Sequence, residues 1–95
     1  MPEINFKIEW SDGMQETCYS PSLVVKKYFT PGKEYELAEF VSLSDEALNI
    51  ASDRVKAAYG FPCGKALGQL QRIKLKAAKY AEMDNPKVRF IEFIE

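Results

Sequence analysis

Histidine is absent from this sequence of 95 residues, and its absence excludes several kinds of site. Without imidazole, the chain has no Ser-His-Asp triad, no Cys-His pair and no HExxH zinc helix. It also has no imidazole that changes charge near neutral pH. Cysteine is scarce: Cys18 and Cys63 are the only two, too few for a closed zinc site. With no disulfide framework, the sequence predicts a cytoplasmic protein with no metal site and no cofactor.

Long hydrophobic runs and an excess of charge of one sign are also absent. The apolar runs are far shorter than the roughly 20 residues of a membrane span, so we expect no membrane association. Residues 1–5 lack the basic and apolar regions of a signal peptide. Thirteen basic and 14 acidic residues leave a net charge of −1, which does not favour nucleic acid as a partner.

The composition is that of a folded protein, with 46% hydrophobic, 13% aromatic and 28% charged residues. There is no internal repeat and no stretch that resembles a linker. We therefore expect one α+β domain over residues 1–95, small enough that only a modest core can form.

The N-terminal part predicts a β-hairpin. Residues 3–10 alternate between apolar and polar side chains, as in a half-buried strand. Asp12-Gly13 is a hairpin turn signal, and residues 15–19 form the return strand. A two-residue loop pairs Phe6 with Tyr19, whereas a three-residue loop pairs Phe6 with Cys18 and buries the thiol. The two registers place opposite faces of the second strand against the core, and we favour slightly the register that buries Cys18.

Three helices are expected next. The first is short, over residues 21–29, with Ser20 as its N-cap. The second begins near Leu37 or at Ser44 and ends at Gly60 as a left-handed cap. Its apolar stripe comprises Phe40, Ser44, Leu48, Ala51, Val55 and Tyr59.

The third helix opens at Pro62 and runs to about Met83. Its buried stripe comprises Ala66, Leu70, Ile73, Ala77 and Tyr80 or Ala81. Glycines recur every four residues at Gly60, Gly64 and Gly68, a spacing that we interpret as permitting close packing.

Residues 87–94 are rich in β-branched and aromatic side chains and predict a final strand. The expected architecture is a small antiparallel sheet, made of the N-terminal hairpin plus the C-terminal strand. It packs against an antiparallel helix pair and a short extra helix. If the C-terminal strand lies at a sheet edge, its free backbone could pair with a second copy, so a homodimer is one hypothesis.

Cys63 is the candidate catalytic residue. It lies in the first turn of a predicted helix, where free backbone N–H groups and the helix dipole favour a thiolate, and Lys65 is nearby. The ordinary interpretation, which we favour, is a small packing residue at a tight junction. Pairing with Cys18 as a redox switch is a further hypothesis.

Other candidate binding residues fall into two groups. Cys18, Ser20 and Ser22 surround a predicted helix start, where backbone N–H groups can bind an anion but serine usually caps the helix. The third helix has five basic residues and one acidic residue over 64–82, a net charge of +4. The basic residues are Lys65, Arg72, Lys74, Lys76 and Lys79. This face fits either solvent or an acidic partner, and Leu75 among these charges suggests contact with another chain.

Several segments resemble one family of small bacterial proteins. Residues 10–13 (Trp-Ser-Asp-Gly) and 18–25 (Cys-Tyr-Ser-Pro-Ser-Leu-Val-Val) are similar to its opening, and residues 59–61 (Tyr-Gly-Phe) with Cys63 continue the similarity. The family is the nitrogen starvation response family of a nitrilase-centred gene cluster. The resemblance implies a setting in nitrogen scavenging, including from cyanide. It implies genetic neighbours that include a nitrilase, a radical-SAM protein, an acetyltransferase-like protein and a flavin-dependent oxidoreductase. It implies no reaction and transfers no catalytic residue.

The sequence therefore favours a non-enzymatic cytoplasmic accessory protein that binds a protein partner, or itself, through a sheet edge or the basic helix. The alternative hypothesis is a small thiol-dependent enzyme or carrier that uses Cys63. A nucleic-acid-binding regulator would have only the basic helix in its favour.

Overall fold

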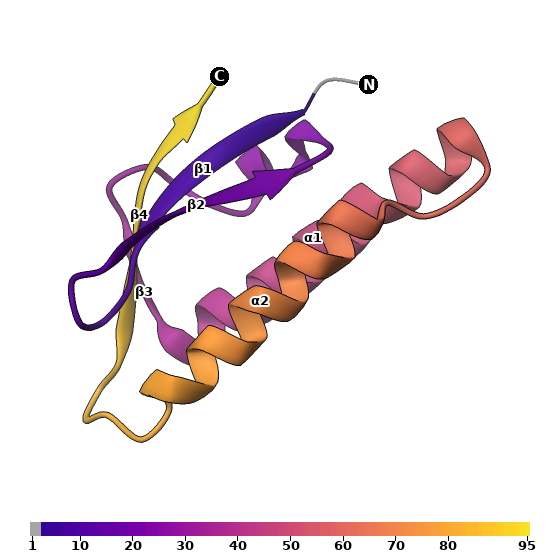
Figure 1. Ribbon diagram of the computed structural model, residues 1–95. Coiled ribbons are helices and arrows are strands. Elements are labelled where there is room, and N and C mark those ends of the chain that lie inside the picture. Colours follow the sequence, from indigo (N-terminus) through magenta and orange to yellow (C-terminus); the bar gives the residue numbers. More distant parts are fainter. Residues whose placement is uncertain (1–2) are drawn as a thin grey trace.

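The computed structural model describes residues 3–95 as a four-stranded antiparallel sheet covered by a helix pair (Figure 1). In chain order, the elements are β1 (Ile4–Glu9), β2 (Gln15–Ser20), the 3-10 helix η1 (Leu23–Lys27), β3 (Glu34–Glu36), α1 (Leu37–Tyr59), α2 (Gly64–Tyr80) and β4 (Lys87–Ile94). The two long helices run antiparallel on one side of the sheet. The predicted α+β architecture is confirmed, with β3 as an additional strand.

The hairpin adopts the register that buries the thiol. Phe6 lies opposite Cys18, and the backbone N–H of Trp10 donates to the Met14 carbonyl at 2.8 Å, which closes a three-residue loop. Gly13 takes a φ of +88°, which non-glycine residues rarely adopt. Burial selects this register because it places Cys18 on the same face as the core side chains of β1.

The prediction of a short helix over residues 21–29 capped by Ser20 is wrong in detail. Ser20 is the last residue of β2, and the N-cap is Ser22, whose Oγ accepts from the Val24 N–H at 3.3 Å. The element is a 3-10 helix of five residues. Its Val24 and Val25 are both buried, and β-branched side chains of this kind weaken an α-helix.

Helix α1 begins at Leu37, the earlier of the two expected starts, and ends at Gly60 with a φ of +91° as predicted. The expected stripe is buried from Phe40 to Ala51, but Tyr59 at its end is 58% exposed. The sheet does not cover this end of the stripe, because the helix pair extends past the end of the sheet (Figure 1).

Helix α2 is shorter at both ends than the predicted 62–83. It begins at Gly64, after Cys63 as an extended N-cap residue, and ends at Tyr80. The predicted buried stripe on this helix is confirmed, with Tyr80 rather than Ala81 as its last member. The close packing expected at Gly60, Gly64 and Gly68 is wrong, because a Cβ at any of them would meet nothing within 4 Å.

Strand β4 lies inside the sheet and not at its edge. The strand order is β2-β1-β4-β3, so β2 and β3 form the edges. The backbone N–H of Gly32 donates to the Phe90 carbonyl at 2.7 Å, and the N–H of Phe90 donates to the Lys33 carbonyl at 2.9 Å. Residues 32 and 33, which precede β3, therefore also pair with β4 at Phe90. Along residues 87–89, β3 occupies the side of β4 that a second copy would need, and β2 is the longer edge strand.

Aromatic side chains dominate the core between the sheet and the helices. Phe6, Phe29 and Phe90 stack with ring centroids 5.0–6.2 Å apart. Trp10 stacks on Tyr80 of α2 with centroids 5.5 Å apart. These contacts orient the sheet relative to α2. Among residues 3–95, none of the helices has both the length and the hydrophobicity of a membrane span.

Candidate binding surface on α2 and β2

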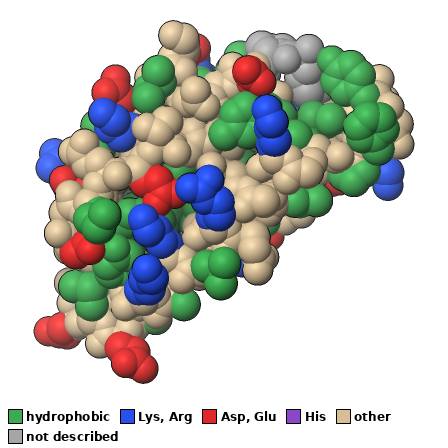
Figure 2. Space-filling model, viewed as in Figure 1, with side chains coloured by type: hydrophobic (Ala, Val, Ile, Leu, Met, Phe, Trp, Pro, Cys, Tyr) green, Lys and Arg blue, Asp and Glu red, His purple; other side chains and the backbone are tan. Residues whose placement is uncertain are grey.

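The candidate surface lies where α2 passes the edge strand β2. Helix α2 directs its apolar stripe into the core, which leaves most of its basic residues on the opposite side. Figure 2 shows these basic side chains gathered on the face that carries α2, with an acidic group among them. Two shallow hollows follow the boundary between α2 and β2, and Arg72 lines both.

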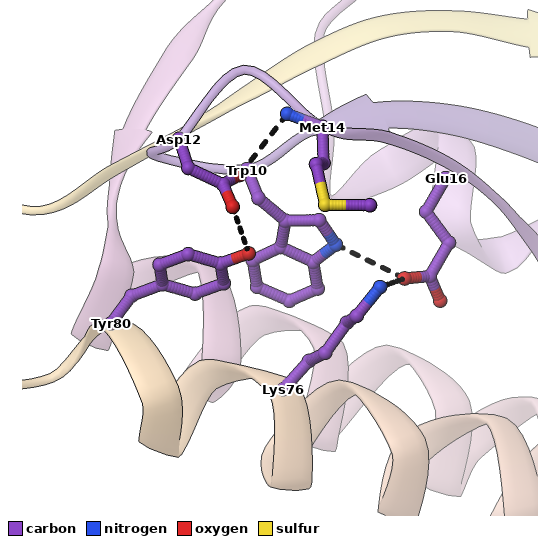
Figure 3. Close-up of polar contacts among 6 residues, drawn as sticks. All are labelled: Trp10, Asp12, Met14, Glu16, Lys76 and Tyr80. Carbon is purple, nitrogen blue, oxygen red and sulfur yellow. Dashed lines mark hydrogen bonds and ion pairs between the residues drawn. The ribbon is translucent and has the colours of Figure 1, made fainter.

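A polar network holds the hairpin against α2 (Figure 3). Glu16 Oε1 accepts a hydrogen bond from Trp10 Nε1 at 3.1 Å and from Lys76 Nζ at 3.1 Å. In the turn, the Tyr80 hydroxyl donates to Asp12 Oδ2 at 3.0 Å. The pKa of Asp12 is lowered, mainly by the hydrogen bond from the Met14 backbone N–H.

The first hollow, called here the Leu75 hollow, has a volume of about 210 Å³ and is lined by Glu16, Arg72, Leu75, Lys76 and Lys79. Leu75 is 63% exposed. On a helix, Arg72 and Lys79 are its neighbours one turn away on either side. An apolar side chain is thus surrounded by cationic ones at the surface.

The second hollow, called here the Gln69 hollow, has a volume of about 440 Å³ and is lined by Tyr19, Lys65, Gly68, Gln69 and Arg72. The Tyr19 backbone N–H donates to Gln69 Oε1 at 3.1 Å, so the amide side chain of α2 binds the edge of β2. Lys65 Nζ lies 5.7 Å from the centroid of the Tyr19 ring, within the range of a cation–π contact.

Gln69 has one side-chain atom without a partner. The residue is only 7% exposed, and among residues 3–95 its Nε2 is buried with no hydrogen-bond partner. Because Oε1 accepts from a backbone N–H, the geometry identifies Nε2 as the free donor. Buried amide donors are rarely left unsatisfied in folded proteins.

Some basic residues of α2 are neutralised within the fold and others are not. Lys74 pairs with Asp45 and Lys76 with Glu16, both at 3.1 Å. Within the described part of the chain, Lys65, Arg72 and Lys79 form no ion pair. The three unpaired cations lie along the two hollows.

Tyr19 contributes a neutral ring to this surface. Its hydroxyl donates to Glu3 Oε2 at 2.9 Å. Burial raises the pKa of Tyr19 to about 12, assisted by the hydrogen bond to Glu3 and by the negative charge of Glu3. The phenol therefore stays protonated at neutral pH.

The candidate residue Cys18 lies in the core and is 1% exposed. Burial, assisted by the Glu16 carboxylate, raises the pKa of its thiol to about 12. Protonated and inaccessible, this thiol cannot act as a nucleophile at neutral pH.

Cys63 is partly buried at the N-cap of α2, and its backbone N–H donates to Ser52 Oγ at 3.1 Å. Both cysteines are free thiols in the structure. In residues 3–95, no three Cys, Asp or Glu side chains are grouped so that they could hold a metal ion. A catalytic role for Cys63 stays a prediction.

Ser20 and Ser22 are buried and use their hydroxyls inside the fold. Ser20 Oγ donates to the Ser22 carbonyl at 2.7 Å, and Ser22 Oγ accepts from Arg54 at 3.1 Å. Ser22 therefore caps η1, Ser20 holds the turn after β2, and neither serine lines the two hollows.

Sequence reasoning did not identify Tyr19, Gly68 or Gln69 as members of this surface. One signal was present: Gln69 lies three residues after Ala66 and four before Ile73, so a polar residue interrupts the apolar stripe. Such a position predicts a buried amide that needs a partner.

The family model described as "Nitrogen starvation-induced protein NitG" matches residues 5–93. The chain belongs to this family. The NitG match includes every residue of the two hollows, and it confirms the nitrogen starvation resemblance. Comparisons with curated proteins and with solved structures found no match.

Proposed function

We propose that this NitG-family chain is a non-enzymatic cytoplasmic accessory protein of nitrogen starvation. In this proposal it binds a protein partner that presents an acidic surface, and the docking surface comprises the Leu75 and Gln69 hollows. Association with the nitrilase-centred gene cluster belongs to the same proposal.

One observation carries the proposal: an exposed leucine stands between two cations that have no partner within the described chain. Leu75 is 63% exposed, and neither Arg72 nor Lys79 forms an ion pair there. An apolar anchor surrounded by charge is the arrangement expected at a protein interface. Charge complementarity then selects a partner with carboxylates around an apolar pocket.

A second copy of the chain is a competing occupant of the same surface. The chain carries 14 acidic residues, so the acidic groups of one copy could meet the basic helix of another. Light scattering on the purified protein separates the two cases, because a dimer dispersed by Leu75→Asp would replace the partner proposal with self-association.

The test is affinity purification from nitrogen-starved cells, followed by reconstitution of the captured protein with the purified chain. The test variant is the double substitution Arg72→Glu and Lys79→Glu, which reverses both unpaired charges. We expect it to weaken reconstituted binding by about tenfold or more, with a steep dependence on salt in the wild type.

Lys27→Glu is the matched control, since Lys27 is an exposed basic residue on η1, away from α2. It should bind like the wild type. If the double variant and Leu75→Asp both bound the partner with wild-type affinity, the proposal would be overturned.

A further inference from the structure

The Gln69 hollow combines three features that the core does not require. It is lined by Gln69, whose Nε2 is a buried donor without a partner, and by two cations, Lys65 and Arg72. None of these groups has an acceptor within the described residues, apart from the Tyr19 ring beneath Lys65. Donors that converge without acceptors match a ligand that supplies acceptors only.

The spacing along α2 explains why the donors converge. Lys65, Gln69 and Arg72 follow one another at intervals of four and three residues, so their side chains leave the same face of the helix on successive turns. Gln69, the middle residue, is anchored through Oε1 to the edge of β2 at 3.1 Å. This bond fixes the plane of the amide and hence the direction of the Nε2 donor.

Gly68 keeps the hollow open. A glycine in a helix interior costs about 1 kcal/mol relative to alanine. Packing does not require it here, because an added Cβ would meet nothing within 4 Å. The missing side chain leaves space beside Gln69, between Lys65 and Arg72. A role in keeping a binding hollow open accounts for the presence of Gly68, which helix packing does not require.

The neighbouring acidic groups are already engaged. Glu3, at the far end of the Tyr19 ring, accepts from the Tyr19 hydroxyl at 2.9 Å. Glu16 is held by Trp10 and Lys76 in the adjacent hollow. Neither carboxylate forms an ion pair with Lys65 or Arg72. The positive charge of the Gln69 hollow is therefore available to a ligand.

We propose that the Gln69 hollow binds a carboxylate group. Arg72 supplies the planar pair of donors that suits a carboxylate, Gln69 Nε2 supplies a neutral donor, and Lys65 supplies a second charge. The ring of Tyr19 offers an apolar wall to the carbon atoms attached to the carboxylate. The carboxylate comes either from a free carboxylic acid or from an acidic side chain of a protein partner. In the second case, the inference rests on the proposed function and names the group that is recognised.

The experiment is a titration of the ¹⁵N-labelled full chain, followed through the side-chain amide of Gln69 and the backbone amide of Tyr19. One arm uses succinate, and the other uses the peptide acetyl-Gly-Glu-Gly-amide. Succinamide and acetyl-Gly-Gln-Gly-amide are the neutral controls, and sodium chloride keeps the ionic strength constant. We expect saturable shifts of both signals with at least one carboxylate and none with the neutral controls. The arm that binds more tightly identifies the source.

Two variants remove the site in different ways. Gln69→Glu keeps an acceptor for the Tyr19 N–H but replaces the donor with a carboxylate, and it should weaken binding by about tenfold or more. Gly68→Leu fills the hollow without removing a donor and should weaken binding similarly. Lys27→Gln, an exposed basic residue of η1 that lines neither hollow, is the matched control and should leave the affinity unchanged.

Non-saturable shifts, wild-type affinity in both site variants, or preference for inorganic phosphate over succinate would overturn the carboxylate assignment. If a captured partner still depends on Arg72 and Lys79 while no carboxylate probe binds, the proposed function stands and this inference falls.

Discussion

The backbone N–H of Tyr19 donates to the side-chain oxygen of Gln69 at 3.1 Å, and this bond joins the edge strand β2 to helix α2. An edge strand presents free backbone groups that can pair with other chains. Here a helix side chain occupies one of them. The same bond leaves the Gln69 amide nitrogen as a buried donor without an acceptor among residues 3–95.

Replacing Gln69 should expose this point of the edge. Gln69→Met removes the acceptor at similar side-chain size, so we expect faster hydrogen exchange at the Tyr19 amide and a loss of about 1 kcal/mol in the free energy of unfolding. Gln69→Glu retains an acceptor and should preserve protection of this amide. Hydrogen exchange followed by NMR measures both, and unchanged exchange in Gln69→Met would refute the role of the bond.

Glu16 should stabilise the protein more by accepting the Trp10 hydrogen bond than by its ion pair with Lys76. Glu16→Ala leaves Trp10 Nε1 without its partner, and we expect a loss of about 1–3 kcal/mol in the free energy of unfolding. Glu16→Gln keeps an oxygen for the indole and should cost less than half as much. Urea denaturation measures both values, and equal losses would show that the ion pair with Lys76 dominates.

Substitution by alanine should change the stability of the protein in opposite directions at Gly68 and at Gly60. Gly68→Ala should stabilise the protein by up to about 1 kcal/mol, because alanine favours the helix and its Cβ finds open space. Gly60→Ala should destabilise it by about 1 kcal/mol or more, since Gly60 has a φ of +91°. Thermal unfolding of the two variants tests the pair, and a destabilising Gly68→Ala would mean that the site is less open than the structure indicates.

Alkaline pH should destabilise the protein through the buried thiol. The pKa of Cys18 rises from an ordinary 9.0 to about 12 in the fold, mainly because of burial. The unfolded chain therefore loses this proton first, and the thiol's contribution is complete below about pH 9 and lost progressively above it. Urea denaturation from about pH 8 to about pH 10 should show this decline in the wild type and a smaller one in Cys18→Ala. Cys63→Ala serves as the control and should keep the decline.

The two cysteines should differ in reactivity towards iodoacetamide. We expect Cys63 to be alkylated in the native protein and Cys18 only on unfolding, because the Cys18 thiol is buried and protonated. Mass spectrometry of the native and urea-unfolded protein locates the label. In cells, Cys63→Ser should retain function under nitrogen starvation; loss of function would favour the thiol-dependent alternative.

The order of apolar and polar residues within short segments determined much of the secondary structure of this protein. The alternation from Ile4 to Trp10 predicts a strand with one buried face, and the stripe from Phe40 to Ala51 predicts a helix. Gly60 ends that helix because its left-handed backbone suits glycine. These features depend on neighbours within one or two turns, which a single sequence records.

Contacts between segments that are distant in the sequence determined the strand order and the exposure of Tyr59. The strand β3, with three residues, exists through its pairing with β4, and β4 became an inner strand because β3 covers it. The exposure of Tyr59 reflects where the sheet ends, and no periodicity along α1 contains that boundary.

The candidate site shows the same division. The sequence alone identified Lys65, Arg72 and Lys76 as members of a basic helix face. Only the tertiary structure brought Tyr19 of β2, 50 residues away, against Gln69, and so created a hollow with a buried free donor. The physical reason is that a hydrogen bond between distant segments depends on how the sheet and helix pack, which the spacing of residues along the chain does not specify.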